Sequence, residues 1–171
     1  MRLALPISLV VSLVLGIAAT PAHADALDEA FPAPHWKRGV SPNGVGFDCL
    51  TDTCGGPAHV VVMRAPANRT MAAKINSGAL TKEWAAKLAE AFRRQQGDKV
   101  TVISFEIEKG QAPSWSMIYE CNCEGQTNFI SSRTVANDKM TLTYYSSARN
   151  ADVAQENLTK LIDAAVGGAS R

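Results

Sequence analysis

Apolar and polar residues alternate along much of the chain, and in two stretches the apolar positions recur every three or four residues. Alternation is typical of strands, and it marks residues 99–108, 115–123, 128–135 and 140–145. Two earlier strands are predicted at residues 45–50 and 59–65, on either side of a Gly-Gly-Pro breaker. Steps of three and four predict helices at residues 80–96 and 151–166. The predicted order is β-β-α-β-β-β-β-α.

Capping residues support both helices. Thr81 is a suitable N-cap for the first helix, although Ser77 would start it earlier, and Asn150 is a suitable N-cap for the second. Gly97 suits a left-handed end of the first helix. Gly167 and Gly168 end the second helix, so the sequence marks where each helix begins and where it ends.

The segments between these elements have little periodicity. Residues 25–31 are expected to form a short helix or a loose arm, and residues 32–44 an extended lead-in that Trp36 anchors by burial of its ring. Residues 67–79 are expected to be a connector. We therefore divide the chain into an N-terminal arm over residues 25–44 and a single α+β domain over residues 45–171.

Short turns join the last four strands. Such strands must be antiparallel neighbours, because a parallel return needs a long crossover. Helices packed on an antiparallel sheet, here of about six strands with two main helices, define the α+β class. In residues 99–108 the alternation places four residues on one side of the strand: Thr101, Ile103, Phe105 and Ile107.

The first 24 residues have the pattern of a secretory signal peptide. Arg2 provides the positive charge, residues 3–19 are mostly apolar, and Ala22-His23-Ala24 is a small-x-small cleavage site. We expect cleavage after Ala24 and a periplasmic or secreted protein. No later apolar run approaches the ~20 residues of a membrane span, so we expect no membrane span in the mature form.

Charge excludes some partners. Arg2 is the only charged residue before the cut, so the remaining 147 residues carry 16 basic and 16 acidic side chains. A neutral chain argues against nucleic acid and against electrostatic binding to anionic membranes. Aromatic residues make up 6% of the sequence, which argues against a stacking platform for bases or sugars.

Four cysteines follow the signal, and an oxidising compartment favours disulfides. Cys49 and Cys54 are separated by a short polar loop that can return to the ~5.5–6 Å Cα spacing of a disulfide. Cys121 and Cys123 lie two apart on a strand, so they pair with each other only if the chain kinks. Otherwise each pairs with Cys49 or Cys54. Because four cysteines allow three pairings, the sequence favours Cys49–Cys54 and leaves the pairing of Cys121 and Cys123 open.

Chemistry at the cysteines is the alternative to a bracing role. A strained disulfide at Cys121 and Cys123 would exchange thiols readily, but Glu120 and Glu124 would raise the thiol pKa and disfavour a thiolate. Zinc or copper binding by the cysteines with His59 or His35 is a further possibility, although the spacings do not match common zinc knuckles. We therefore expect no bound metal or cofactor.

Catalytic motifs are missing from the sequence. Gly-x-Ser-x-Gly, His-Glu-x-x-His and the phosphate loop do not occur. His35 and His59 are interpreted as packing or edge residues, and Glu106 and Glu108 as a solvated strand face. These observations favour a protein that is not an enzyme and leave no catalytic residue to name.

The order of elements resembles the Mog1/PsbP-like architecture, over roughly residues 39–166. The Cys-x4-Cys-Gly stretch, Cys49, Cys54 and Gly55, also resembles small uncharacterised exported proteins of Gram-negative bacteria. The resemblance implies an adaptor or binding module rather than a set of catalytic residues. The resulting hypothesis is a disulfide-stabilised exported module that binds an unknown protein or small molecule, with its oligomeric state open. The alternative is a periplasmic thiol-redox or metal-handling protein that uses Cys121 and Cys123.

Overall fold

One antiparallel sheet organises the chain. Within residues 21–96, 99–123 and 125–167, which the computed structural model describes, it has seven strands in the order β1-β2-β3-β7-β6-β5-β4. The strands are β1 (Lys37–Ser41), β2 (Gly44–Cys49), β3 (Ala58–Pro66), β4 (Lys99–Glu108), β5 (Ser114–Cys123), β6 (Gln126–Ala136) and β7 (Met140–Ala148). The predicted α+β class and antiparallel pairing are confirmed.

Four α-helices accompany the sheet in the same residues: α1 (Pro21–Ala30), α2 (Arg69–Ser77), α3 (Lys82–Gln96) and α4 (Ala151–Gly167). Two predicted N-caps are confirmed. Thr81 Oγ1 accepts a hydrogen bond from the backbone N–H of Trp84 at 3.2 Å. Asn150 Oδ1 accepts from the N–H groups of Asp152 and Val153 at 2.8 and 3.3 Å. Each cap satisfies backbone donors that the first turn of a helix leaves unpaired.

The prediction was wrong in two segments ahead of β4. The connector expected at residues 67–79 contains α2, which Asn68 caps by accepting from the N–H of Met71 at 2.9 Å. The nine-residue helix is too short for its apolar positions to establish a period. The lead-in contains β1, which is exposed along its whole length and pairs with β2. An exposed edge strand has no apolar face, so alternation does not reveal it.

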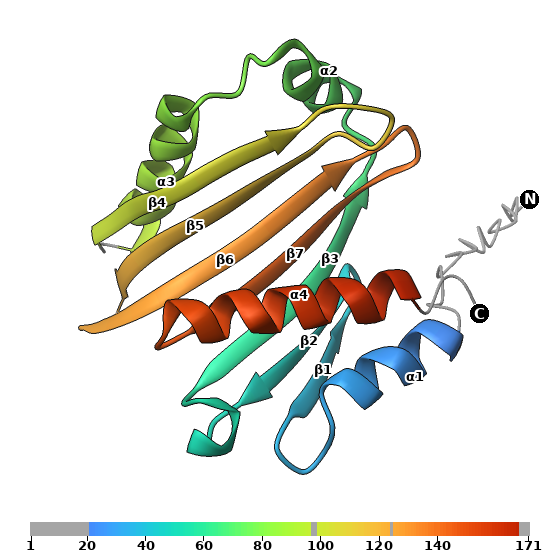
Figure 1. Ribbon diagram of the computed structural model, residues 1–171, viewed down its shortest axis with the longest axis vertical. Coiled ribbons are helices and arrows are strands. Elements are labelled where there is room, and N and C mark those ends of the chain that lie inside the picture. Colours follow the sequence, from blue (N-terminus) through green and yellow to red (C-terminus); the bar gives the residue numbers. More distant parts are fainter. Residues whose placement is uncertain (1–20, 97–98, 124, 168–171) are drawn as a thin grey trace, which may run out of the picture.

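The helices cover opposite faces of the sheet (Figure 1). On one face α4 packs across β3, β7 and β6, and α1 packs against α4. On the other face α3 lies on β4 and β5, and α2 contacts β4, β5 and β6. The two helix pairs are offset toward opposite edges, so each covers part of its face.

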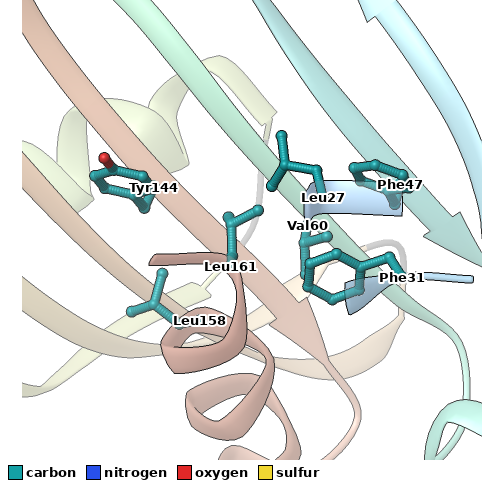
Figure 2. Close-up of a cluster of buried hydrophobic side chains, with 7 residues drawn as sticks. All are labelled: Leu27, Phe31, Phe47, Val60, Tyr144, Leu158 and Leu161. Carbon is teal, nitrogen blue, oxygen red and sulfur yellow. The ribbon is translucent and has the colours of Figure 1, made fainter. Parts of the chain in front are cut away.

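The main hydrophobic core lies under α1 and α4. Figure 2 shows its buried side chains: Leu27, Phe31, Phe47, Val60, Tyr144, Leu158 and Leu161. The ring of Phe31 lies 5.2 Å from that of Phe47 and 4.9 Å from that of Trp36, measured between centroids. Trp36 therefore packs on this core, as expected of an anchor. A second cluster joins α2 and α3 to the other face, with Ile75 and Leu80 buried against Ala136.

The face predicted for β4 was wrong, because the strand contains a β-bulge. The register with β5 shifts between Val102 and Ser104, and Ile103 is 47% exposed. The extra residue changes the alternation, so Thr101 lies opposite Glu120 whereas Phe105 lies opposite Met117. Because Glu120 and Met117 are three residues apart on β5, they point to opposite faces. Thr101 and Phe105 therefore do not share a side.

Candidate functional site

The face that carries α2 and α3 leaves side chains of β2, β3 and β7 within reach of solvent. Cross-strand register identifies this face, because Met63, Thr143, Thr134 and Trp115 form one row across four strands. Trp115 packs in the cluster under α2 and α3, whereas Met63 at the other end of the row is 41% exposed. We call this region the open face, and its side chains are Asp48, His59, Val61, Met63, Thr143, Tyr145 and Ser147.

An aspartate and a histidine are joined on the open face. Asp48 on β2 and His59 on β3 are direct cross-strand partners, and His59 Nδ1 lies 2.6 Å from Asp48 Oδ1. Their side chains are 49% and 41% exposed. The bond fixes the orientation of the imidazole and leaves its Nε2 atom as the polar group that can meet a ligand.

One tyrosine, Tyr145, lies beside this pair, and a second, Tyr119, interacts with Tyr145. The ring of Tyr145 is 6.1 Å from that of His59, at 60°. Burial raises the pKa of Tyr145, and a hydrogen bond with the side chain of Ser147 opposes that rise. Burial also raises the pKa of Tyr119, and the neighbouring Tyr145 adds to that rise. Both phenols therefore stay neutral at ordinary pH and act as hydrogen-bonding groups rather than as anions.

The row that contains His59 also contains a serine, so a Ser-His-Asp relay has to be considered. Ser147 is the direct cross-strand neighbour of His59. Its side chain hydrogen-bonds to Tyr145, and within the described residues His59 bonds to Asp48 and not to Ser147. A relay needs the hydroxyl on the second ring nitrogen of the histidine. Among the described residues, the arrangement orients His59 but does not place the Ser147 hydroxyl on its second ring nitrogen.

Glycines on β2 leave bare backbone beside the open face. A Cβ atom at Gly44 would lie 2.2 Å from the carbonyl oxygen of Val62, so no other residue fits there without a shift. A Cβ atom at Gly46 would lie 3.2 Å from the carbonyl oxygen of Val60 and 3.4 Å from Cε1 of His59. A strand glycine can mark a place where another group approaches the backbone closely. Glycine at these positions therefore lets β3 and the imidazole of His59 lie close to the backbone of β2.

Three of the four cysteines are described and all three are in disulfides. Cys49 bonds to Cys54 with Cα atoms 6.3 Å apart, and this bridge closes the end of β2 across the short 3-10 helix Asp52–Cys54. Cys121 is also disulfide-bonded and is 3% exposed. The side chain of Cys123 lies outside the described residues, so its pairing stays a prediction.

The other residues considered from the sequence do not join the open face. Glu108 lies on the opposite face, where it pairs with Arg133 and accepts a hydrogen bond from Ser114 at 3.2 Å. The carbonyl oxygen of His35 lies 3.9 Å from Cys54 Sγ. Across the described ranges, no three His, Cys, Asp or Glu side chains gather as metal ligands would. The described helices include none of sufficient length and apolar character to cross a membrane.

Sequence reasoning missed the Asp48–His59 pair. Asp48 follows Gly44 and Gly46 at steps of two, and this alternation places the three residues on the face opposite Val45 and Phe47. That signal was available. The partner of Asp48 was not, because it depends on the register between β2 and β3.

Comparison with known proteins gives similarity in structure alone. No family model matches the chain, and no curated protein matches it. The solution structure of cyanobacterial PsbP (CyanoP) from Synechocystis sp. PCC 6803 aligns with a TM-score of 0.51 at 13% identity, over 79% of this chain and 81% of that one. The protein therefore has a PsbP-like fold, as the resemblance in the sequence implied.

Two further structures are similar at a lower level. PA94 from Pseudomonas aeruginosa, a protein of unknown function described as a putative regulator, aligns with a TM-score of 0.46 at 12% identity, over 75% of this chain and 81% of that one. LpqN of Mycobacterium tuberculosis, described as involved in cell envelope biogenesis, aligns with a TM-score of 0.41 at 12% identity, over 82% and 78%.

Proposed function

We propose that the protein is an exported, non-enzymatic binding module that takes a small ligand on the open face. The observation that carries the proposal is the oriented Asp48–His59 pair beside the ring of Tyr145 and the bare backbone of β2. These groups combine apolar contact area with one fixed polar group. Such a combination is typical of small-molecule sites.

The size of the open face favours a small ligand over a protein partner. Three adjacent strands cover about 15 Å, and three rows of side chains at steps of two residues cover about 20 Å. The resulting area is on the order of 300 Å², whereas a stable protein interface covers about 800 Å² on each partner. A ligand of one or two rings matches these dimensions.

The hydrogen bond to Asp48 defines what His59 offers. In the neutral imidazole, Nδ1 donates its proton to the Asp48 carboxylate, so Nε2 carries the free electron pair and accepts a hydrogen bond. Val61 and Met63 supply apolar contacts in the neighbouring rows. The ligand class is therefore an aromatic or aliphatic body that carries a hydroxyl or N–H donor.

Ligand-observed NMR with paired fragments tests this function. Phenols should bind the purified protein, and the matching methyl ethers, which lack the donor, should bind at least about fivefold more weakly because the Nε2 atom would be left unpaired. His59→Ala should abolish the preference, and His35→Ala serves as the matched control. Binding that ignores both the donor and His59, or measurable turnover of a bound fragment, would contradict the proposal.

The thiol-redox alternative requires access to the cysteines. Cys121 is 3% exposed, and exchange needs an attacking thiolate to reach the disulfide sulfur. Burial therefore disfavours exchange at this sulfur. Non-reducing peptide mass spectrometry, with free-thiol counting on protein taken from the periplasm, tests both the pairing of Cys121 with Cys123 and the redox role.

Export is the remaining part of the proposal. The signal pattern of residues 1–24 supports it. Expression of the full chain in a Gram-negative host, followed by fractionation and N-terminal sequencing, should yield a periplasmic or secreted product that begins at Asp25. A cytosolic product that keeps residues 1–24 would be the opposite result.

A further inference from the structure

A second group of side chains lies on the face of the sheet that carries α1 and α4. Tyr144 on β7 is the direct cross-strand partner of Arg133 on β6 and of Val62 on β3. Arg64 lies two residues beyond Val62 and so shares its face. Diagonal neighbours of this kind are about 7–8 Å apart at Cα. Two guanidinium groups therefore flank one phenol from the strands on either side of it.

The hydroxyl of Tyr144 is available to donate a hydrogen bond to a ligand. The residue is 5% exposed, and Figure 2 shows its ring beside the buried leucines of α4 with the oxygen at the end that points away from them. The oxygen makes no hydrogen bond with any described residue. It is not among the fully enclosed unpaired polar atoms, which are Ser146 Oγ and Asn157 Nδ2. A tyrosine buried in this way usually finds a partner for its hydroxyl.

The two arginines differ in the partners of their guanidinium groups. Arg133 donates to Glu108 and, at 3.3 Å, to Ser114 Oγ, so its charge is balanced and its position is fixed. Arg64 is exposed and makes no ion pair among the described residues. Among the described residues, the group therefore carries one positive charge without a counter-charge and one hydroxyl donor without an acceptor.

We propose that Arg64, Tyr144 and Arg133 form a binding site for an oxyanion, a carboxylate or a phosphate. Arginine presents a planar fork of donors that matches the two oxygens of such a group. The Tyr144 hydroxyl adds one more hydrogen-bond donor, between the two guanidinium groups. The site lies on the face opposite His59, so it stands independently of the function proposed for the open face. Burial raises the pKa of Tyr144 while Arg64 and Arg133 lower it, which agrees with both charges lying near the hydroxyl.

Inorganic phosphate is the first probe, followed through the Nε–H resonances of Arg64 and Arg133 in the full protein at constant ionic strength. Binding should saturate below about 100 mM. Tyr144→Phe keeps the buried ring and should weaken binding about tenfold, the usual effect of losing a hydrogen bond to a charged group. Arg64→Gln should weaken it at least as much.

Two controls keep the test specific. Arg69→Gln makes the same charge change at the start of α2, on the other face, and should leave phosphate affinity within about twofold. His59→Ala should also leave it unchanged, which separates this site from the open face. Absence of saturation, equal loss in the Arg69 variant, or wild-type affinity in Tyr144→Phe would each overturn the proposal.

Vesicles then identify where the oxyanion comes from. If the variants behave as expected with phosphate, flotation with phosphatidylglycerol vesicles that depends on Arg64 assigns the site to a lipid headgroup. Phosphate binding without flotation assigns it to a free small anion. Phosphatidylcholine vesicles are the matched control, and both assignments support an oxyanion site.

Discussion

All three tyrosines of the chain have a raised pKa, so the native protein should resist alkaline ionisation. Burial is the largest cause at each position, because it disfavours the charged phenolate. In the unfolded chain a tyrosine titrates near pH 10 and is about 90% ionised at pH 11. The perturbation is therefore a pH increase from 9 to 12, with absorbance at 295 nm recorded for the native protein and for the protein in denaturant.

The sign of the stability change follows from proton binding. Between pH 10 and the higher native pKa values, the folded state holds protons that the unfolded state has released, so stability falls as pH rises. Below pH 10 the tyrosines contribute no pH dependence. At pH 11 the loss is about 1.4 kcal/mol for each tyrosine that stays neutral when folded, or about 4 kcal/mol for all three as an upper limit. That is a large part of a typical total stability of about 5–15 kcal/mol.

The assay has a clear refuting outcome. Circular dichroism recorded with the absorbance shows whether the chain is still folded. At pH 10.5 the folded protein should show less phenolate absorbance than the protein in denaturant, and Tyr119→Phe should remove one third of the absorbance that appears at higher pH. A full three-tyrosine change with a midpoint near pH 10, while the dichroism remains native, would refute the burial argument.

Three further predictions concern stability. Phe47→Ala should cost about 3–5 kcal/mol in urea unfolding because the ring is 1% exposed, whereas Leu50→Ala, at 79% exposure, should stay within about 0.5 kcal/mol. Replacing Cys49 and Cys54 by alanine should cost about 2 kcal/mol, because the closed loop spans a separation of only 5 residues; no change in the thermal midpoint would contradict this. Asn76→Ala should cost about 1–3 kcal/mol by thermal unfolding, since its side chain makes two hydrogen bonds, at 2.9 and 3.1 Å, to the backbone of the β4–β5 turn; a neutral result would show that α2 does not depend on that contact.

The fold could be predicted where apolar periodicity was strong. The strand at Lys99–Glu108 has the predicted bounds, and α3 and α4 begin next to the caps that marked them. Periodicity did not predict β1, because its side chains are all exposed. It did not predict α2 either, because Ile75 is the only buried residue of that helix. The bulge after Val102 could not be predicted from alternation either, because alternation assumes that the register does not shift. Local pattern thus identified elements that bury a continuous face and missed those that do not.

The candidate sites depend on a different kind of information, which is the pairing of distant strands. Alternation alone assigns Asp48 and Phe47 to opposite faces of β2, but only the β2–β3 register brings His59 to Asp48, and only the β3–β7 pairing brings Tyr145 to His59. The β3–β7 pairing joins segments that lie about 80 residues apart in the chain. In the sheet, β7, β6 and β5 lie between β3 and β4, which places β7 next to β3. The same pairing places Arg64 and Arg133 on either side of Tyr144. Both proposed sites therefore depend on β7, which lies between β3 and β6. A variant that weakens the β3–β7 pairing should impair both kinds of binding together. Single substitutions at His59 or Arg64 should each impair one kind of binding and leave the other unchanged.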